Sequence, residues 1–224
     1  MLSIVSTPIG NPDDITPRAL RALREASAVI CEERRDGARL LSAYQIQKEL
    51  VELNEHTERD LVPELIARLK NNESLALISD HGTPLLADPG GRLVTQAIAQ
   101  NVPVSAIPGA SALLAALVVS GLPMQRFRFV GFLSAKKETR RAELARLRNE
   151  PETWVAFDAP YRLNALLADI RASVEPSRKM VVACNLTMPS ENIVRGTVKQ
   201  VADYLEKNKF KGEFVLVVEG KSKP

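Results

Sequence analysis

The chain has 224 residues, 45% of them hydrophobic and 25% charged, and carries a formal net charge of +3. This is the composition of a globular protein with one large domain or two small ones, and the net charge is too small to indicate a nucleic-acid partner by itself. No stretch approaches the roughly 18 uninterrupted apolar residues of a membrane span. No signal-peptide pattern opens the chain. The sequence therefore predicts a cytoplasmic protein without membrane association.

Strand-like and helix-like segments alternate from the first residue to the last, which predicts an α/β fold. The expected strands are residues 2–6, 28–31, 75–79, 104–107, 128–132, 153–157, 180–184 and 213–219. The expected helices are residues 17–26, 60–70, 93–100, 112–119, 138–148, 161–172 and 198–208. Gly121 and Pro123 mark the obvious hinge, so we expect two α/β domains, residues 1–110 and 111–224, with a ligand cleft between them.

Polar loops rich in glycine and proline follow four of these strands. The most informative is residues 79–84, which continues into residues 88–91, and the others are residues 7–12, 108–112 and 158–162. In open α/β sheets, ligands bind outside the carboxyl ends of the strands. Each loop also has a purely structural interpretation, in which Asp80 closes an Asx turn and Ser111 caps the next helix.

Several common catalytic and cofactor motifs are missing from the sequence. It contains no Gly-x-Gly-x-x-Gly, no P-loop and no Gly-x-Ser-x-Gly, which disfavours ordinary dinucleotide, ATP and serine hydrolase sites. Cys31 and Cys184 lie in apolar runs without metal-ligand spacing, so we expect buried free thiols and no metal site. The chemistry is therefore expected to come from an activated cosubstrate that the protein positions.

Ordered motifs over nearly the whole chain carry a resemblance to a known family. They include Thr7-Pro8-Ile9-Gly10-Asn11, Cys31-Glu32, Ser79-Asp80-His81-Gly82-Thr83-Pro84, Asp88-Pro89-Gly90, Pro108-Gly109-Ala110-Ser111-Ala112, Ser120-Gly121-Leu122-Pro123, Gly131-Phe132-Leu133 and Lys211-Gly212-Glu213-Phe214. Together they resemble the 16S ribosomal RNA 2'-O-ribose cytidine methyltransferases of the tetrapyrrole methylase superfamily. The resemblance implies two α/β domains, S-adenosylmethionine bound in the cleft between them, and a homodimer.

The resemblance also implies roles for individual residues. Around the cosubstrate it places Pro8, Gly10, Asp80, Gly82, Thr83, Gly109, Ala110, Ser111, Ala112, Phe132, Ala159, Leu186 and Gly212. A base must remove the proton of the acceptor, and the candidates are Glu32, Glu55 and His56, with His81 as a further candidate. Phosphates of 16S ribosomal RNA in the 30S subunit would be contacted from two basic clusters, chiefly by Arg35, Lys136 and Lys137. Taken alone, the cluster at residues 136–148 is better explained as the solvated face of a helix.

The chain departs from the family's motifs at several positions. Arg34 and His81 replace other residues in otherwise matching loops, and Asn185 and Met188 stand where the family has glutamate and lysine. The leading hypothesis is S-adenosylmethionine-dependent 2'-O-methylation of a ribose in 16S ribosomal RNA. The alternatives are methylation of a tetrapyrrole or another small molecule, and a non-catalytic paralogue that binds S-adenosylmethionine.

Overall fold

The computed structural model describes residues 1–221 and divides the chain into two compact units, Met1–Ser111 and Ala112–Pro224. Each unit has its own sheet and core. The α/β fold class predicted from the alternating pattern is confirmed. No helix among the described residues combines the length and the apolar composition needed to cross a bilayer.

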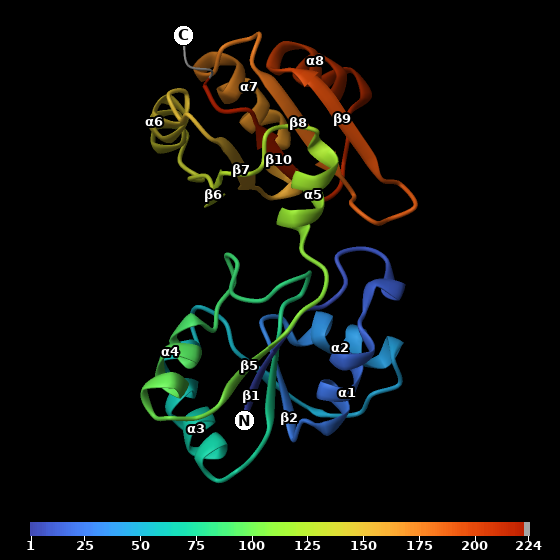
Figure 1. Cartoon of the computed structure of the whole chain (residues 1–224), viewed down its shortest axis with the longest axis vertical. Coiled ribbons are helices and arrows are strands. Elements are labelled where there is room, and N and C mark those ends of the chain that lie inside the picture. The colour runs from blue at the N-terminus through green and yellow to red at the C-terminus, as the bar shows by residue number, and fades with distance from the viewer. Residues whose placement is uncertain (222–224) are drawn as a thin grey trace. The chain divides into compact units, whose positions relative to one another are not determined.

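The N-terminal unit contains a five-stranded parallel sheet in the order β3-β2-β4-β1-β5. Its strands are β1 (Leu2–Val5), β2 (Ala28–Cys31), β3 (Glu49–Glu52), β4 (Leu75–Ile78) and β5 (Val104–Ile107). Its helices are η1 (Pro12–Asp14), α1 (Pro17–Glu25), α2 (Arg34–Ala43), α3 (Glu58–Lys70) and α4 (Gly91–Ala99). Helices α3 and α4 lie on one face of the sheet and α1 and α2 on the other (Figure 1).

Alternation along the strands divides the N-terminal core between the two faces of the sheet. Leu2, Ile30 and Leu77 face the cluster made with α3 and α4, whereas Val5 and Val29 face the cluster made with α1 and α2. Successive strand side chains point to opposite faces, so a strand buried on both sides must be apolar throughout. This accounts for the uninterrupted apolar sequences of β2 and β4.

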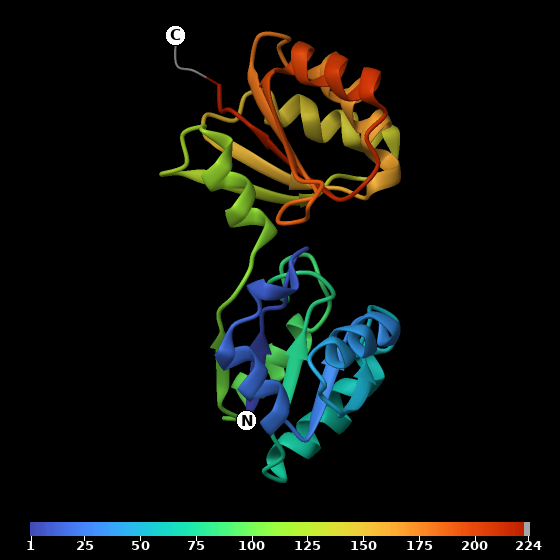
Figure 2. The ribbon, with the colours of Figure 1, turned by 90° about the vertical axis from the view of Figure 1, so that its right-hand side faces the viewer.

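The C-terminal unit contains a mixed five-stranded sheet in the order β6-β7-β10-β8-β9. Strands β6 and β7 are parallel, and β10 is antiparallel to both of its neighbours. The elements are α5 (Ala112–Ser120), β6 (Phe127–Phe132), α6 (Lys137–Leu147), β7 (Thr153–Phe157), η2 (Pro160–Arg162), α7 (Leu163–Ser173), β8 (Lys179–Cys184), β9 (Asn192–Thr197), α8 (Val198–Asn208) and β10 (Phe214–Val218). Helices α6, α7 and α8 cover one face of the sheet and α5 the other (Figure 2).

Besides the short helix η1, two strands and one α-helix were not predicted from the sequence. Strands β3 and β9 lie at sheet edges, where one side of the backbone is unpaired and charged or polar residues such as Glu49 and Asn192 are tolerated. Helix α2 contains Gly37, which weakens its helical pattern. A side chain at Gly37 would approach Cys31 Sγ to 2.8 Å, so this glycine permits α2 to pack closely on β2.

Both cysteines are buried free thiols, as predicted. Burial raises the pKa of Cys31 to about 11 and that of Cys184 to about 12, so neither is a thiolate at neutral pH. Among the described residues, no cluster of three or more His, Cys, Asp or Glu side chains could hold a metal ion.

A buried ion pair joins α6 to α7. Arg140 Nε and Nη2 donate to Asp169 Oδ2 at 2.9 and 2.6 Å, and both side chains are more than nine-tenths buried. Arg140 also donates to the carbonyl oxygens of Ser134 and Ala135, which fixes the loop after β6. Although burial opposes it, hydrogen bonds from Arg141 and Arg140 lower the pKa of Asp169. The pair therefore stays ionised in the folded protein.

We expect Asp169→Asn to lower the free energy of unfolding by about 3–5 kcal/mol, because it leaves a buried guanidinium without a counter-charge. Urea denaturation followed by circular dichroism measures the loss. Arg141→Gln is the matched control, since Arg141 is half exposed and an exposed ion pair contributes at most about 1 kcal/mol. Equal losses in the two variants would contradict the structural role of the Arg140 pair.

Candidate functional site

All five strands of the N-terminal sheet are parallel, so their carboxyl ends lie along one edge. The loops that begin there carry most of the residues singled out in the sequence. They are residues 6–11 after β1, 32–33 after β2, 53–57 after β3, 79–90 after β4 and 108–111 after β5. We call this set of loops the N-terminal loop edge.

Thr7 links the loops after β1 and β4. Its hydroxyl donates to the Ser79 carbonyl oxygen at 3.0 Å and accepts the Gly82 N–H at 3.0 Å, while its own N–H donates to the Gly82 carbonyl oxygen at 2.9 Å. Thr7 is only 1% exposed. Hydrogen bonds between buried groups that cannot reach water hold backbone firmly. Thr7 therefore fixes the chain on both sides of Asp80.

The loop after β5 is joined to the same group. Ser6 Oγ donates to Thr83 Oγ1 at 3.2 Å, and Thr83 Oγ1 donates to the Ala110 carbonyl oxygen at 3.0 Å. A Cβ at Gly109 would lie 2.9 Å from Ser6 Cβ, so the close approach of the two loops requires glycine. The predicted cosubstrate residues Gly82, Thr83, Gly109 and Ala110 thus belong to one hydrogen-bonded assembly.

The loop after β4 has an unusual backbone. Gly82 and Gly90 have positive φ angles of 90° and 107°, and so do two residues with side chains, Leu85 at 72° and Ala87 at 73°. Such conformations are costly for residues other than glycine and concentrate at functional sites. Glu58 supports the end of this loop, because its Oε1 accepts the N–H groups of Gly90 and Arg92 at the start of α4.

Asp80 lies in the middle of the N-terminal loop edge. Burial raises its pKa, while a hydrogen bond from the Glu33 N–H and the nearby His81 oppose that rise. Its Oδ1 atom is buried and has no hydrogen-bond partner among the described residues. A buried acceptor without a donor is costly, so this atom is suited to receive a hydrogen bond from a bound ligand. The nearby exposed His81 also opposes the rise in the pKa of Asp88.

Three carboxyl groups influence one another at this edge. Burial, together with the charges of Asp88 and Asp80, raises the pKa of Glu32 to about 6. Burial likewise raises the pKa of Asp88, which accepts a hydrogen bond from the side chain of Ser79. Asp88 was visible in the sequence as part of the Asp-Pro-Gly motif but was not assigned a role. Perturbed carboxyl groups in a loop cluster are candidate acid–base residues.

Glu55 and His56 lie in an exposed turn after β3. Each side chain is 84% exposed, and His56 Nε2 lies 3.4 Å from Glu55 Oε1. The side chain of Asn54 holds the turn by accepting the N–H groups of His56 and Thr57. The charge of Glu55 contributes to the raised pKa of Glu32, so the turn lies near that carboxyl group. Of Glu32, Glu55 and His56, only Glu32 is partly buried.

The remaining predicted cosubstrate residues gather at one edge of the C-terminal sheet. Phe132 ends β6, Ala159 follows β7, Leu186 follows β8 and Gly212 precedes β10. The register pairs Phe214 with Cys184 and Val215 with Phe157, which places these strand ends side by side. Phe132 is 53% exposed and Leu186 is buried.

An ion pair fixes the loop that contains Ala159. Arg162 Nε lies 3.0 Å from Asp158 Oδ1, and the Ala159 N–H donates to the same oxygen at 2.7 Å. Arg162 Nη2 also donates to the carbonyl oxygens of Leu133 and Ser134. Asp158 and Arg162 therefore hold the loop in place.

Asn185 has a structural role at the position where the family has glutamate. It adopts a left-handed backbone with φ of 47°, a conformation that asparagine tolerates better than most residues. Its N–H donates to the Glu213 carbonyl oxygen at 2.8 Å, and its amide donates to Ser190 Oγ at 3.0 Å. A side chain at Gly212 would overlap the Asn185 amide. Glycine at residue 212 therefore leaves room for the Asn185 side chain.

The predicted RNA contacts are exposed in both units. Arg35 lies in the first turn of α2, and Lys136 and Lys137 lie at the start of α6. Two other arginines near these residues are engaged within the fold. Arg140 is buried against Asp169, and Arg34 donates to the Leu50 carbonyl oxygen at 2.9 Å.

Comparison with known proteins gives the family. The family model of Tetrapyrrole (Corrin/Porphyrin) Methylases matches residues 1–202. The chain is 44% identical over 223 residues to ribosomal RNA small subunit methyltransferase I of Xylella fastidiosa, covering 98% of this chain and 81% of that protein. It is 43% identical to the protein of the same name from Pseudomonas aeruginosa, covering 100% of this chain and 80% of the relative.

Solved structures agree with this assignment at the level of the fold. Diphthine synthase matches with a TM-score of 0.73 and 20% identity, covering 100% of this chain and 91% of that one. Uroporphyrin-III C-methyl transferase from Thermus thermophilus, solved with S-adenyl homocysteine, matches with a TM-score of 0.67 and 21% identity, covering 97% and 96%. The resemblance carried by the sequence motifs is confirmed. The chain belongs to the tetrapyrrole methylase family and, within it, to the group of the ribosomal RNA small subunit methyltransferase I proteins.

Proposed function

We propose that this chain is an S-adenosylmethionine-dependent methyltransferase that methylates a ribose 2'-hydroxyl of 16S ribosomal RNA within the 30S subunit, in the cytoplasm. The observation that carries the proposal is the identity of 43–44% over almost the whole chain to proteins named ribosomal RNA small subunit methyltransferase I. The site geometry supports it, because the motifs that define the resemblance lie in hydrogen-bonded loops at strand ends.

The N-terminal loop edge suits the polar groups of S-adenosylmethionine. The cosubstrate brings a cationic sulfonium, ribose hydroxyls and an amino acid end, which need oxygen acceptors and backbone groups. Asp80 supplies a carboxylate oxygen without a partner, and the exposed backbone at Gly109 lies beside the same assembly. Pro8, Gly10, Ser111 and Ala112, with Phe132, Ala159, Leu186 and Gly212 of the C-terminal unit, complete the assignment.

Glu32 is the candidate that best fits the role of general base. A ribose hydroxyl must lose its proton as it attacks the methyl group, and a carboxylate with a pKa near 6 is a stronger base than an exposed one and is still ionised at neutral pH. Glu55 and His56 remain candidates on their motif alone, since their side chains are in solvent.

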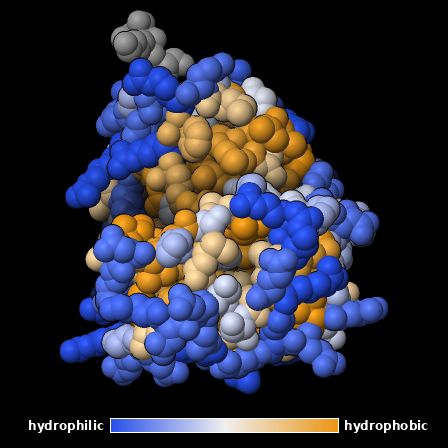
Figure 3. Space-filling model, turned by 60° about the horizontal axis from the view of Figure 1, so that its bottom comes forward, coloured by the Kyte–Doolittle hydropathy of each residue, from blue (hydrophilic) through white to orange (hydrophobic). Residues whose placement is uncertain are grey.

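We also propose that the chain forms a homodimer through α5. Helix α5 is apolar on all sides. Its side chains Leu114 and Val118 are spaced one turn apart and are 54% and 63% exposed. Polar side chains dominate the face shown in Figure 3, with apolar residues exposed among them. Contiguous exposed apolar surface is typical of an interface.

Replacing Val118 with lysine should shift the protein from dimer to monomer in sedimentation equilibrium, because the charge would be desolvated at the interface. Lys137→Gln, on another helix of the unit, is the control and should leave the mass unchanged. An unsubstituted protein that sediments as a monomer would contradict the proposed dimer.

Purified protein should transfer labelled methyl groups from S-adenosylmethionine to 16S ribosomal RNA in 30S subunits, and not to a tetrapyrrole precursor. Naked 16S ribosomal RNA is assayed alongside. Asp80→Asn should weaken cosubstrate binding roughly tenfold or more by calorimetry, because a charged acceptor is lost. Asp60→Asn, on the exposed side of α3, is the matched control. Methylation of the tetrapyrrole alone would transfer the proposal to the small-molecule alternative, and binding without any transfer would favour a non-catalytic paralogue.

Glu32→Gln should reduce kcat for 30S methylation by about 100-fold or more, because it removes the base. In the unsubstituted enzyme, kcat should fall as the pH drops below about 6, since Glu32 then becomes protonated.

Glu32→Gln should lower activity but raise the stability of the folded protein. The pKa of Glu32 is higher in the folded than in the unfolded protein. The contribution of Glu32 to folding stability is therefore fully present below the unfolded pKa of 4.5 and is lost as the pH rises through about 6. Glu32→Gln should therefore raise Tm relative to the unsubstituted protein at pH 8 more than at pH 4. A Tm difference that is independent of pH would argue that Glu32 is not buried as described.

A further inference from the structure

The two units differ strongly in charge. Residues 1–111 contain 11 Lys and Arg against 15 Asp and Glu, a formal net charge of −4. Residues 112–224 contain 19 Lys and Arg against 12 Asp and Glu, a formal net charge of +7. The small net charge of the whole chain conceals this division. A polyanion is attracted by the C-terminal unit and repelled by the N-terminal one.

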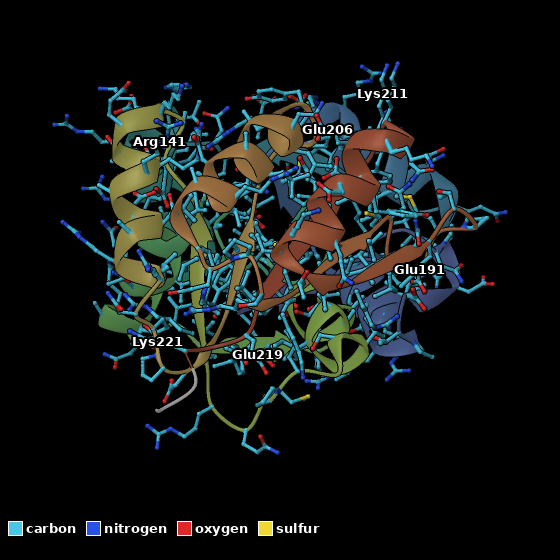
Figure 4. All side chains as sticks on the ribbon, turned by 90° about the horizontal axis from the view of Figure 1, so that it is seen from above. Arg141, Glu191, Glu206, Lys211, Glu219 and Lys221 are labelled. Atoms are coloured by element: carbon cyan, nitrogen blue, oxygen red, sulfur yellow. The ribbon has the colours of Figure 1, made fainter. Side chains whose placement is uncertain are left out.

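A groove of about 960 Å³ runs between α7 and α8 on the C-terminal unit. Its floor is apolar and is formed by residues of the two helices and of the segment after α8, namely Leu163, Leu167, Ala168, Ala202 and Phe210. Its polar lining includes Asn164, Arg171, Glu206, Lys209 and Lys211. Figure 4 shows Glu206 on α8 and Lys211 beyond the end of that helix, at the side of the helical layer away from Arg141.

The cations of this groove are not all neutralised by the fold. Arg171 Nη1 lies 2.8 Å from Asp203 Oδ1 and 3.5 Å from Glu206 Oε2. Glu206, the one carboxylate in the lining, therefore already has a counter-charge. Lys209 and Lys211 are exposed, and within residues 1–221 neither makes an ion pair. Two lysines without an ion pair in the described part of the chain therefore line the same groove.

Tyr161 stands at one end of the groove with its side chain in solvent. It is 87% exposed, the largest value among the exposed apolar and aromatic residues of the described chain. The residue lies in η2, whose position is fixed by the Asp158–Arg162 ion pair. An exposed aromatic ring on a fixed backbone segment beside cations is the arrangement that stacks on an unpaired base while the cations contact phosphates.

We propose that this groove binds a single-stranded segment of RNA, with Tyr161 stacked on a base and with Lys209 and Lys211 contacting phosphates. The proposal rests on the proposed function, whose RNA substrate it locates. A single strand fits because the apolar floor and the ring need bases that are not stacked in a duplex.

The position of the groove suits delivery of RNA to the methyl donor. Its lining residues Pro160 and Lys211 are direct neighbours in sequence of Ala159 and Gly212, which the motifs assign to the cosubstrate. These residues belong to adjoining strand ends of one sheet. An RNA strand in the groove therefore leads to the predicted cosubstrate residues of the same unit.

Fluorescence anisotropy with a labelled single-stranded RNA of about 12 nucleotides, within the usual range of site sizes, tests the proposal on the full chain. Tyr161→Ala should raise Kd by about 5-fold or more, and Tyr161→Phe should restore binding because it keeps the ring. Lys209→Gln combined with Lys211→Gln should reduce the slope of log Kd against log salt by about 1.4, as expected for two lost phosphate contacts. Lys207→Gln is the matched control, since Lys207 is exposed on α8 outside the groove and should leave Kd at the value of the unsubstituted protein apart from general charge effects.

Methylation of 30S subunits by the same variants separates this proposal from the proposed function. If Tyr161→Ala raises KM for 30S subunits in parallel with Kd for RNA, the groove is the RNA site. If the unsubstituted protein methylates 30S subunits while all groove variants keep its Kd, salt slope and KM, the proposal is overturned and the proposed function stands. A raised KM for 30S subunits with unchanged binding of RNA would instead assign the groove to a ribosomal protein and overturn the proposal. If 30S subunits are not methylated at all, the proposed function fails, and the anisotropy series still decides whether the groove binds RNA.

Discussion

The hydrogen bonds of the Thr7 hydroxyl are the constraint on which the candidate site depends. This buried group binds Ser79 on one side and Gly82 on the other, so it holds the ends of the segment that contains Asp80. Thr83 extends the connection to the loop after β5. Three loops that are separated by about 70 and 30 residues in the chain thus form one unit of structure, and the strained backbone that follows is tolerated because its start is held in this way.

The two units offer different chemistry. The N-terminal loop edge concentrates carboxyl groups whose pKa values burial raises, which suits binding of a cationic donor and removal of a proton. The C-terminal unit carries the excess of positive charge, an exposed tyrosine and a groove with two free lysines. A methyltransferase acting on RNA needs both properties. If the acidic residues were spread over the surface that binds RNA, they would weaken that binding.

Most of the fold could be predicted because strands buried on both faces are uninterrupted apolar runs, as in β2 and β4. The edge strands β3 and β9 were not predicted, because edge strands tolerate polar residues. The gathering of Asp80 and the glycines at one edge of the sheet could be predicted, since parallel strands bring their carboxyl ends together. The effect of Asp88 on the pKa of Glu32 could not be predicted, because the two residues lie in loops that follow different strands.

By itself, the sequence determined the α/β alternation, the loops at the strand ends and the family, because these depend on local periodicity and on ordered motifs. Only the tertiary structure decided which charges are free. Arg140 and Lys137 stand three residues apart on one helix, yet Arg140 is buried against Asp169, 29 positions away, while Lys137 is exposed. The role proposed for Lys209 and Lys211 likewise depends on Tyr161, which belongs to another helix and lines the same groove. Whether a charge is neutralised depends on what folding brings within a few ångströms of it, and that neighbour is often far away in the sequence.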